Sequence, residues 1–297
     1  MTRFKRLAGL RRRVVGGSAR ELGELRAPLS SFPFLSGDTF RFLAGTEFHE
    51  LGLVRRTGLP QHRLFCSIDS LLSSDFLPQA ESWVSANGTG SETLIVHNGD
   101  ARIDRELLNR LGRLFRKVFC VNVLRESANV RALPIGLENA ALNNNGRLNY
   151  YLDGLEAPRN SHRPQLVLAS FHEETNPAVR APARRLFEKS RFGFAGHRWK
   201  RKEYREVVRE TCFVVSPPGN GPDCHRTWEA IYLGAVPVVL RGSLAPSLWR
   251  DMPIHTVEKY EDFLSLTDAE MRDLYARLIQ RPPAKAFADY WISELES

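Results

Sequence analysis

Residues 93–123, TLIVHNGDARIDRELLNRLGRLFRKVFCVNV, decide the fold class of this chain. The runs 93–96 and 118–123 are short and apolar, which is typical of strands that are buried on both faces. Between them, apolar residues recur with a helical period at positions 103, 107, 108, 111, 114 and 115. A strand, a helix and a second strand in this order indicate a parallel α/β sheet.

The same alternation continues on both sides of this stretch. Further strands are predicted at 64–68, 130–135, 166–169, 192–194, 212–215 and 236–240. Further helices are predicted at 178–188, 202–209, 224–233, 259–280 and 283–296. Loop-forming residues interrupt the pattern near 143–164. The alternation on either side of this break predicts an α/β fold made of two Rossmann-like domains. We expect the two domains to face a cleft, because ligands of such sheets bind beyond the carboxyl ends of the strands.

The predicted organisation has four parts. Residues 1–20 form a basic arm, 21–157 a first Rossmann-like domain, 158–282 a second one, and 283–297 a C-terminal helix that could pack back on the first domain. The chain of 297 residues carries 42 Lys+Arg and 34 Asp+Glu, for a net charge of +8. Residues 1–20 hold seven basic side chains and no acidic one, so the remaining 35 basic and 34 acidic side chains nearly balance. A basic arm on a near-neutral body argues against a broad nucleic-acid-binding face.

The arm has two interpretations. Phe4, Leu7, Leu10 and Val14 recur at near-helical spacing among basic residues, so residues 1–17 could lie on an anionic membrane surface. The alternative is a solubilising tail. The longest uncharged apolar stretch, 230–240, falls well short of the roughly 20 residues of a membrane span. Four widely spaced cysteines fit a reduced cytosol, so we expect a cytoplasmic protein, with peripheral membrane association left open.

The segment 216–237, SPPGNGPDCHRTWEAIYLGAVP, is the most informative for function. A strand runs into a loop rich in proline and glycine, and the loop runs into a helix. Gly219 and Gly221 are expected to permit close backbone approach and a positive φ. Asp223 is the predicted N-cap of the helix, and Gly234 is expected to end it.

The charge order on this helix is unusual. His225 and Arg226 occupy its first turn, where the helix dipole disfavours a cation by roughly 0.3–1 kcal/mol. An anion docked there would explain them, since the amides at the start of a helix form an anion site. A diphosphate could contact Arg226 and the loop amides, while Glu229 could accept two ribose hydroxyls. The alternative is an intrahelical pair between Arg226 and Glu229, worth about 0.2–0.5 kcal/mol.

With its P-x-G loop, H-R-x-x-E-A-I core and L-G-x-x-P-V-V tail, the stretch 216–239 resembles the donor-binding segment of exostosin-like glycosyltransferases, in the GT-B superfamily. Residues 134–139 and 97–100 resemble the same family more weakly. The resemblance implies a GT-B fold and transfer of a sugar from a nucleotide diphosphate-sugar to a hydroxyl of a glycan or glycolipid. It implies donor binding by Ser216, Gly219, Asn220, Gly221, Asp223, His225, Arg226 and Glu229.

Two further groups are candidates for catalysis. The cation-rich stretch 193–202 offers Arg198 and Lys200, which could stabilise a departing nucleotide or simply form a solvated surface. His97 and Asp100 follow the strand at 93–96 and could act as a base on the acceptor hydroxyl. Asn98, Gly99 and Asp100 are equally good turn residues. Glu138 and Asp69 are comparable residues at the ends of other predicted strands.

No metal or other cofactor is expected beyond the nucleotide-sugar substrate. The sequence contains no Asp-x-Asp motif, and the adjacent Cys224 and His225 lack the second pair that a zinc site needs. Two alternative functions remain: a non-catalytic peripheral membrane or glycan-binding protein, and a GT-B-like nucleotide-sugar epimerase.

Overall fold

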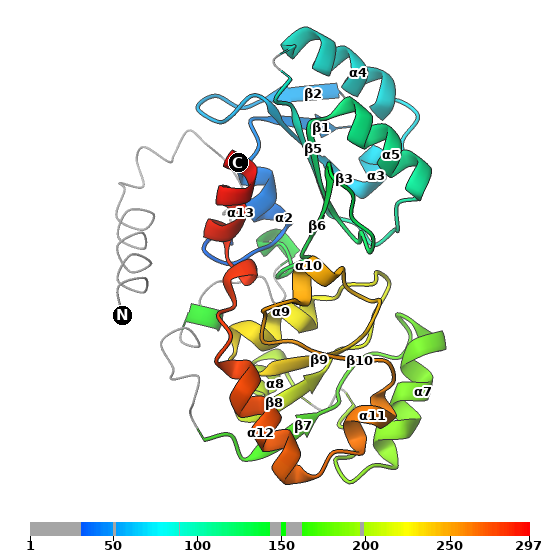
Figure 1. Cartoon of the computed structure of the whole chain (residues 1–297), viewed down its shortest axis with the longest axis vertical. Helices are drawn as coiled ribbons and strands as arrows, with labels where there is room; N and C mark the ends of the chain where they lie inside the picture. The colour runs from blue at the N-terminus through cyan, green and yellow to red at the C-terminus, as the bar shows by residue number, and fades with distance from the viewer. Residues whose placement is uncertain (1–30, 50–51, 89, 143–149, 153–161, 197–198) are drawn as a thin grey trace.

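Two β-sheets, one in each half of the chain, organise the protein (Figure 1). The computed structural model describes residues 31–49, 52–88, 90–142, 150–152, 162–196 and 199–297. The basic arm predicted for residues 1–20 lies outside the described residues. The α/β class is confirmed, with a mostly parallel first sheet and a fully parallel second sheet.

The first sheet has six strands in the order β2-β1-β3-β4-β5-β6. All neighbouring strands are parallel except the hairpin of β1 and β2. The strands are β1 (Thr46–His49), β2 (Gly52–Arg55), β3 (Arg63–Ser67), β4 (Thr93–His97), β5 (Lys117–Val121) and β6 (Val130–Leu133). The strands β3 to β6 match the apolar runs in the sequence, and most of their side chains are buried.

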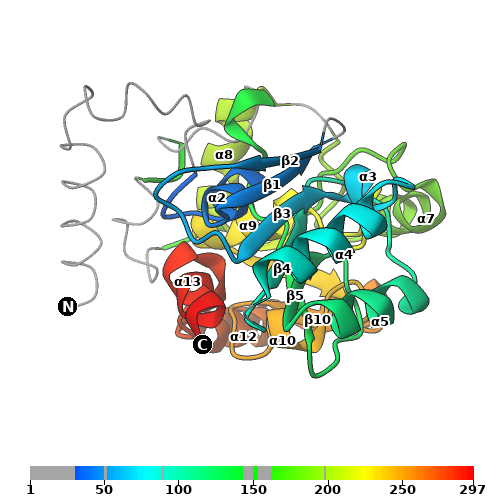
Figure 2. The same cartoon turned by 90° about the horizontal axis from the view of Figure 1, so that it is seen from above.

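Helices cover both faces of this sheet. They are α2 (Gly37–Phe42), α3 (Ile68–Leu71), α4 (Phe76–Asn87) and α5 (Arg105–Leu114), with a 3₁₀ turn η1 (Ala140–Leu142) after β6. In both views α4 and α5 lie on the side opposite α2 (Figures 1 and 2). The α5 helix begins where the sequence favours it, because the Asp104 carboxylate accepts the Leu107 amide at 2.7 Å.

The second sheet has four parallel strands in the order β10-β9-β8-β7. The strands are β7 (Gln165–Leu168), β8 (Thr211–Val215), β9 (Val236–Leu240) and β10 (His255–Val257). Its helices are α7 (Pro177–Glu188), α8 (Arg201–Arg209), α9 (His225–Tyr232), α10 (Pro246–Trp249), α11 (Tyr260–Leu264) and α12 (Asp268–Ile279). Each strand is followed by at least one helix, as parallel pairing requires.

The last helix returns to the first sheet. After the 3₁₀ turn η2 (Ala284–Ala286), α13 (Ala288–Glu296) lies beside α2 (Figure 1). Trp291 is buried and packs edge-on against Phe40 of α2 and Phe119 of β5, with ring centroids 6.1 and 6.4 Å apart. Lys117 donates to the carbonyl of Glu294 at 3.2 Å. The C-terminal helix therefore completes the core of the first half of the chain.

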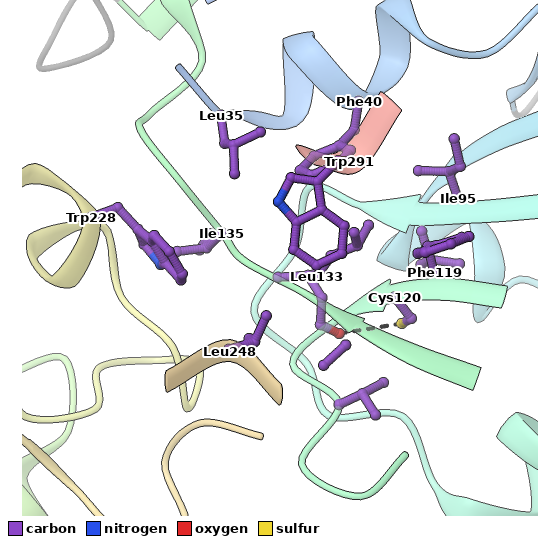
Figure 3. Packing of buried hydrophobic residues seen from close by; sticks show 14 of the residues in the cluster. Leu35, Phe40, Ile95, Phe119, Cys120, Leu133, Ile135, Trp228, Leu248 and Trp291 are labelled. Atoms are coloured by element: carbon purple, nitrogen blue, oxygen red, sulfur yellow. Dashed lines mark hydrogen bonds between the residues drawn. The ribbon is translucent and has the colours of Figure 1, made fainter. Parts of the chain in front are cut away.

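A single hydrophobic cluster connects the two halves. Leu35 and Ile135 of the first half belong to the same buried cluster as Trp228 and Leu248 of the second (Figure 3). The Tyr232 hydroxyl adds a polar connection, since it accepts the amide of Leu35. A second, smaller cluster lies wholly within the second half.

The structure corrects several expectations. Residues 192–194 form a turn and an irregular segment instead of a strand. The helix expected at 259–280 is divided into α11 and α12, because Thr267 caps a new helix through a reciprocal capping box with Glu270. The helix expected at 283–296 is a 3₁₀ turn, η2, followed by α13 from Ala288. The strands β1, β2 and β10 and the helices α2, α3, α4 and α10 were not predicted. Within the described residues, no helix is both long and apolar enough to cross a membrane, and all four cysteines are free thiols.

Candidate functional site

The loops that follow the strands of the two sheets meet at one place. Asn220, after β8, donates its side-chain amide to the Asp100 carboxylate, after β4, at 3.1 Å. The amide of Ile135, after β6, donates to the Asp223 carboxylate at 2.9 Å. The carboxyl ends of both sheets therefore face each other, where open α/β sheets bind ligands. We call residues 98–100, 122, 134–139 and 216–229 the inter-sheet junction.

Two glycines let the 216–223 loop approach its neighbours closely. A Cβ on Gly219 would lie 2.9 Å from Nη2 of Arg180, and one on Gly221 would lie 3.0 Å from Oδ1 of Asn122. The predicted close approach is thus confirmed. The predicted positive φ is wrong, because neither glycine is in the left-handed region. A larger residue at either position would have to displace a neighbouring side chain.

Asp223 does not cap the helix. The N-cap is Cys224, and the Asp223 side chain is buried and accepts the amides of Ile135 and Cys224 and the indole N–H of Trp228, at 2.8–3.0 Å. Burial raises the pKa of Asp223 to about 6, although these three donors oppose the shift. Its carboxylate joins the start of α9 to the first sheet, and its predicted role in donor binding stays a prediction.

His225 and Ser216 are also occupied by protein contacts. The Nδ1 atom of His225 lies 2.8 Å from the carbonyl of Gly136, which only a protonated Nδ1 can contact favourably. The buried Ser216 hydroxyl lies 2.8 Å from that of Thr227 and 3.0 Å from Sγ of Cys224. These contacts hold the loop and helix in place, and the predicted role of both side chains in donor binding stays a prediction.

Arg226 and Glu229 are the predicted contacts of the diphosphate and the ribose on α9. Arg226 hydrogen-bonds with the Tyr204 side chain, and its Nε is buried with no partner among the described residues. Burial acts to lower the pKa of Arg226, but Tyr204, Cys224 and Glu229 together outweigh it and the pKa is raised. The guanidinium is therefore permanently charged.

The Glu229 carboxyl is buried between charges from both halves. It is 7% exposed, so burial raises its pKa, and nearby Glu138 adds to that rise. His225, Arg226 and Arg205 oppose the shift. A buried carboxyl among cations can accept hydrogen bonds from hydroxyl groups, as the ribose interpretation needs. The electrostatic contact between Arg226 and Glu229 also matches the intrahelical alternative.

The two base candidates from β4 have different surroundings. Asp100 is exposed and reaches the 216–223 loop through Asn220. His97 is 2% exposed, accepts the Asn98 amide at Nδ1 and contacts the Pro134 carbonyl through Nε2 at 3.2 Å. Burial lowers the pKa of His97 to about 4, which keeps the imidazole neutral. Both ring nitrogens therefore have partners within the protein, and the role of His97 as a base on the acceptor hydroxyl stays a prediction.

The cation-rich segment before α8 is described only in part. Arg198 lies outside the described residues. Lys200 is exposed at the start of α8, where its backbone amide donates to Glu203 at 3.0 Å. One turn later, Tyr204 contacts Arg226. Burial raises the pKa of Tyr204 to about 12, so its hydroxyl remains protonated. Lys200 is thus one helical turn from the junction.

Several residues of the junction were not predicted. Arg180 of α7 is 4% exposed and donates to the carbonyls of Pro217 and Pro218 at 3.1 and 2.9 Å. The spacing of Arg180 with the buried Ala183 and Phe187 places it on the apolar face of its helix, and this was the available signal. The others are Asn122, Tyr204 and Arg205.

Two cavities lie away from the junction. One of about 280 Å³ is at the amino ends of β3 to β5 and is lined by Arg63, Lys117 and Glu296 among others. One of about 480 Å³ lies between the end of α4 and α5. Neither is lined by a predicted site residue. In the described part of the chain, no three His, Cys, Asp or Glu side chains gather in a way that could hold a metal ion.

Comparison with known proteins adds no family assignment. The chain matches no protein-family model, and no curated protein matches it significantly.

Proposed function

We propose that this protein is an exostosin-like glycosyltransferase of GT-B architecture that transfers a sugar from a nucleotide diphosphate-sugar to a hydroxyl of a glycan or glycolipid. One observation carries the proposal. The carboxyl ends of the parallel strands of two sheets meet at a junction where a permanently charged arginine and a buried carboxyl, Arg226 and Glu229, lie on the helix that follows β8. The resemblance of residues 216–239 supports the same activity.

The charge of each side chain at the junction suggests its role in binding or catalysis. Arg226 and the amides of the 216–223 loop bind the diphosphate, and Glu229 accepts hydrogen bonds from the ribose. Lys200, with Arg198, stabilises the negative charge that develops on the leaving nucleotide. Asp100 positions or deprotonates the acceptor hydroxyl. Asp223, His225 and Ser216 keep the loop and the two sheets in register.

We also propose that residues 1–17 bind the membrane surface on which the acceptor lies. Residues 1–17 carry six basic side chains and near-helical apolar spacing, which suits binding to anionic lipid next to a lipid-linked acceptor in the cytoplasm. Flotation of the whole chain and of a chain lacking residues 1–17 on anionic liposomes tests this. Equal flotation of the two proteins would contradict it.

Nucleotide binding is the direct test of the donor site. A thermal-shift screen with nucleoside diphosphates and nucleotide sugars should raise the unfolding temperature for one nucleobase, since a ligand that binds only the folded state stabilises it. Arg226→Ala and Glu229→Ala should each weaken that binding by about tenfold or more. The control is Arg241→Ala, which removes an exposed arginine that pairs with Glu258 of the same half.

Product analysis separates the candidate activities. The transferase predicts a new glycosidic product only when an acceptor is present. Conversion of the nucleotide sugar without an acceptor would favour an epimerase or a hydrolase. Unchanged nucleotide affinity in both site variants would favour a non-catalytic protein and would reject the proposed donor site.

A further inference from the structure

The buried side of the 216–223 loop is hydrogen-bonded to residues at the start of α7. Neither the motif nor the family resemblance includes this helix. Arg180 donates Nε to the Pro218 carbonyl at 2.9 Å and Nη2 to the Pro217 carbonyl at 3.1 Å. Asn176 donates its side-chain amide to the Gly219 carbonyl at 3.0 Å. Three consecutive carbonyl oxygens of the loop therefore point toward α7.

Peptide geometry fixes where the loop amides point. The loop peptides are trans, so each N–H points opposite to the carbonyl of the preceding residue. The N–H groups of Gly219 and Asn220 consequently point away from α7. Neither amide has an acceptor among the described residues. Pro217, Pro218 and Pro222 have no N–H group. The hydrogen bonds from Arg180 and Asn176 therefore set the direction of the two amides that follow the bonded carbonyls, those of Gly219 and Asn220.

The charge of Arg180 reinforces this polarity. Its guanidinium is buried, packs over the ring of Phe171 and also donates to the His172 carbonyl at 2.8 Å. It lies close enough to Arg226 for the two cations to repel. Within the described residues, no carboxylate is at ion-pair distance from either guanidinium. Arg180 is buried and Arg226 is partly buried, and Glu229 interacts electrostatically with Arg226. An anion bound near both guanidinium groups would relieve the remaining repulsion between them.

We infer that Arg180 and Asn176 are positioning residues that orient residues 217–220, so that the amides of Gly219 and Asn220 form a cradle of hydrogen-bond donors for the diphosphate of the sugar donor. This inference rests on the proposed function, which it deepens by naming the helix that sets the polarity of the loop. Arg180 contributes its long-range charge and holds the carbonyls. The loop amides and Arg226 make the contacts with the phosphate oxygens.

Titration calorimetry with inorganic pyrophosphate and with uridine and guanosine diphosphates tests the inference on the full chain. Arg180→Gln should weaken pyrophosphate binding by about tenfold or more, because it removes a charge-assisted anchor. The matched control is Arg184→Gln, one turn along the same helix, where the side chain is half-exposed and pairs with Glu173 and Glu188. The control should bind like the wild type.

Two more variants separate positioning from loss of fold. Arg180→Lys keeps the charge but cannot donate in the same three directions, so it should restore only part of the affinity. Asn176→Ala, at a half-buried position, releases the Gly219 carbonyl while leaving the charge of Arg180 in place. It should weaken pyrophosphate binding without lowering the unfolding temperature as Arg180→Gln does.

The possible results are distinct. Wild-type affinity for pyrophosphate in folded Arg180→Gln or in Asn176→Ala would overturn the inference. Binding of pyrophosphate but of no nucleoside diphosphate would reject the proposed function and keep the cradle. A wild-type protein that binds neither would reject both.

Discussion

The sequence could predict the roles of some residues at the junction but not of others. Arg226 and Glu229 were predictable because a cation at the start of a helix and a carboxylate three residues later are visible as spacing. The roles of Asp223 and His225 were not, because their partners, the amide of Ile135 and the carbonyl of Gly136, are backbone groups almost 90 residues away. A polar side chain within a motif can bind a substrate, or it can form hydrogen bonds that hold the protein's own backbone in place.

His97 shows the same ambiguity and leads to a prediction about pH. Its pKa of about 4 in the folded protein lies below its ordinary value of 6.5. Between these values the unfolded chain binds the proton more readily, so stability from neutral His97 is complete above pH 6.5 and is lost as the pH falls to 4. The expected loss is about 3 kcal/mol.

His97→Gln isolates this effect. Glutamine keeps a donor for the Pro134 carbonyl but does not titrate, and it loses the stacking of His97 on Phe40. The variant should be less stable than the wild type at pH 7, and the difference should shrink by about 3 kcal/mol by pH 4. Urea unfolding of both proteins at the two pH values measures it. A difference that does not change with pH would contradict the assignment of the proton.

At the level of elements, long apolar runs and clear helical periods predicted most of the parallel strands and their crossover helices. The pattern failed where ion pairs or short elements replace apolar runs. The strand β1 contains Glu47, which is buried only because Arg41, Arg56 and His49 surround it. The α4 helix was overlooked although Phe76, Ala80 and Trp83 have helical spacing and are buried.

The end of α9 was predicted from one glycine, and its surroundings give a second prediction. Gly234 has a φ of +79°, and a Cβ there would lie 2.4 Å from Nη2 of Arg163. That guanidinium is buried and donates to the carbonyls of Val208, Thr211 and Leu233 at 2.8–3.0 Å. Gly234→Ala must displace it, so we expect a loss of about 2–4 kcal/mol beyond the backbone strain.

A matched glycine separates the two costs. Gly193 has a φ of +70°, and a Cβ there would meet nothing within 4 Å. Gly193→Ala should therefore show the backbone cost alone, about 1–2 kcal/mol. Denaturant unfolding of the two variants gives the comparison. Equal losses would mean that Arg163 can move away without cost and that the helix end is not fixed by this contact.

For the whole molecule, the inter-sheet junction has a structural as well as a chemical role. The core cluster that includes Leu133 and Ile135 continues into α9 and α10 through Trp228 and Leu248 (Figure 3). The Asp223 carboxylate links the same two halves. A shared core and a buried polar link predict that the chain unfolds as one unit, although its sequence divides into two α/β halves.

Asp223→Asn tests this unity. The amide group would place N–H donors against some of the three N–H groups that the carboxylate now accepts, which should cost about 2–4 kcal/mol. Since Asp223 joins both halves, the loss should move a single transition that tryptophan fluorescence and far-ultraviolet circular dichroism report together. The control is Asp100→Asn. Asp100 also connects the two sheets, but it is exposed, and the amide oxygen of an asparagine there can still accept the hydrogen bond from Asn220. It should change stability little. Two separate transitions in Asp223→Asn would show that each half folds alone and that the junction only holds finished parts together.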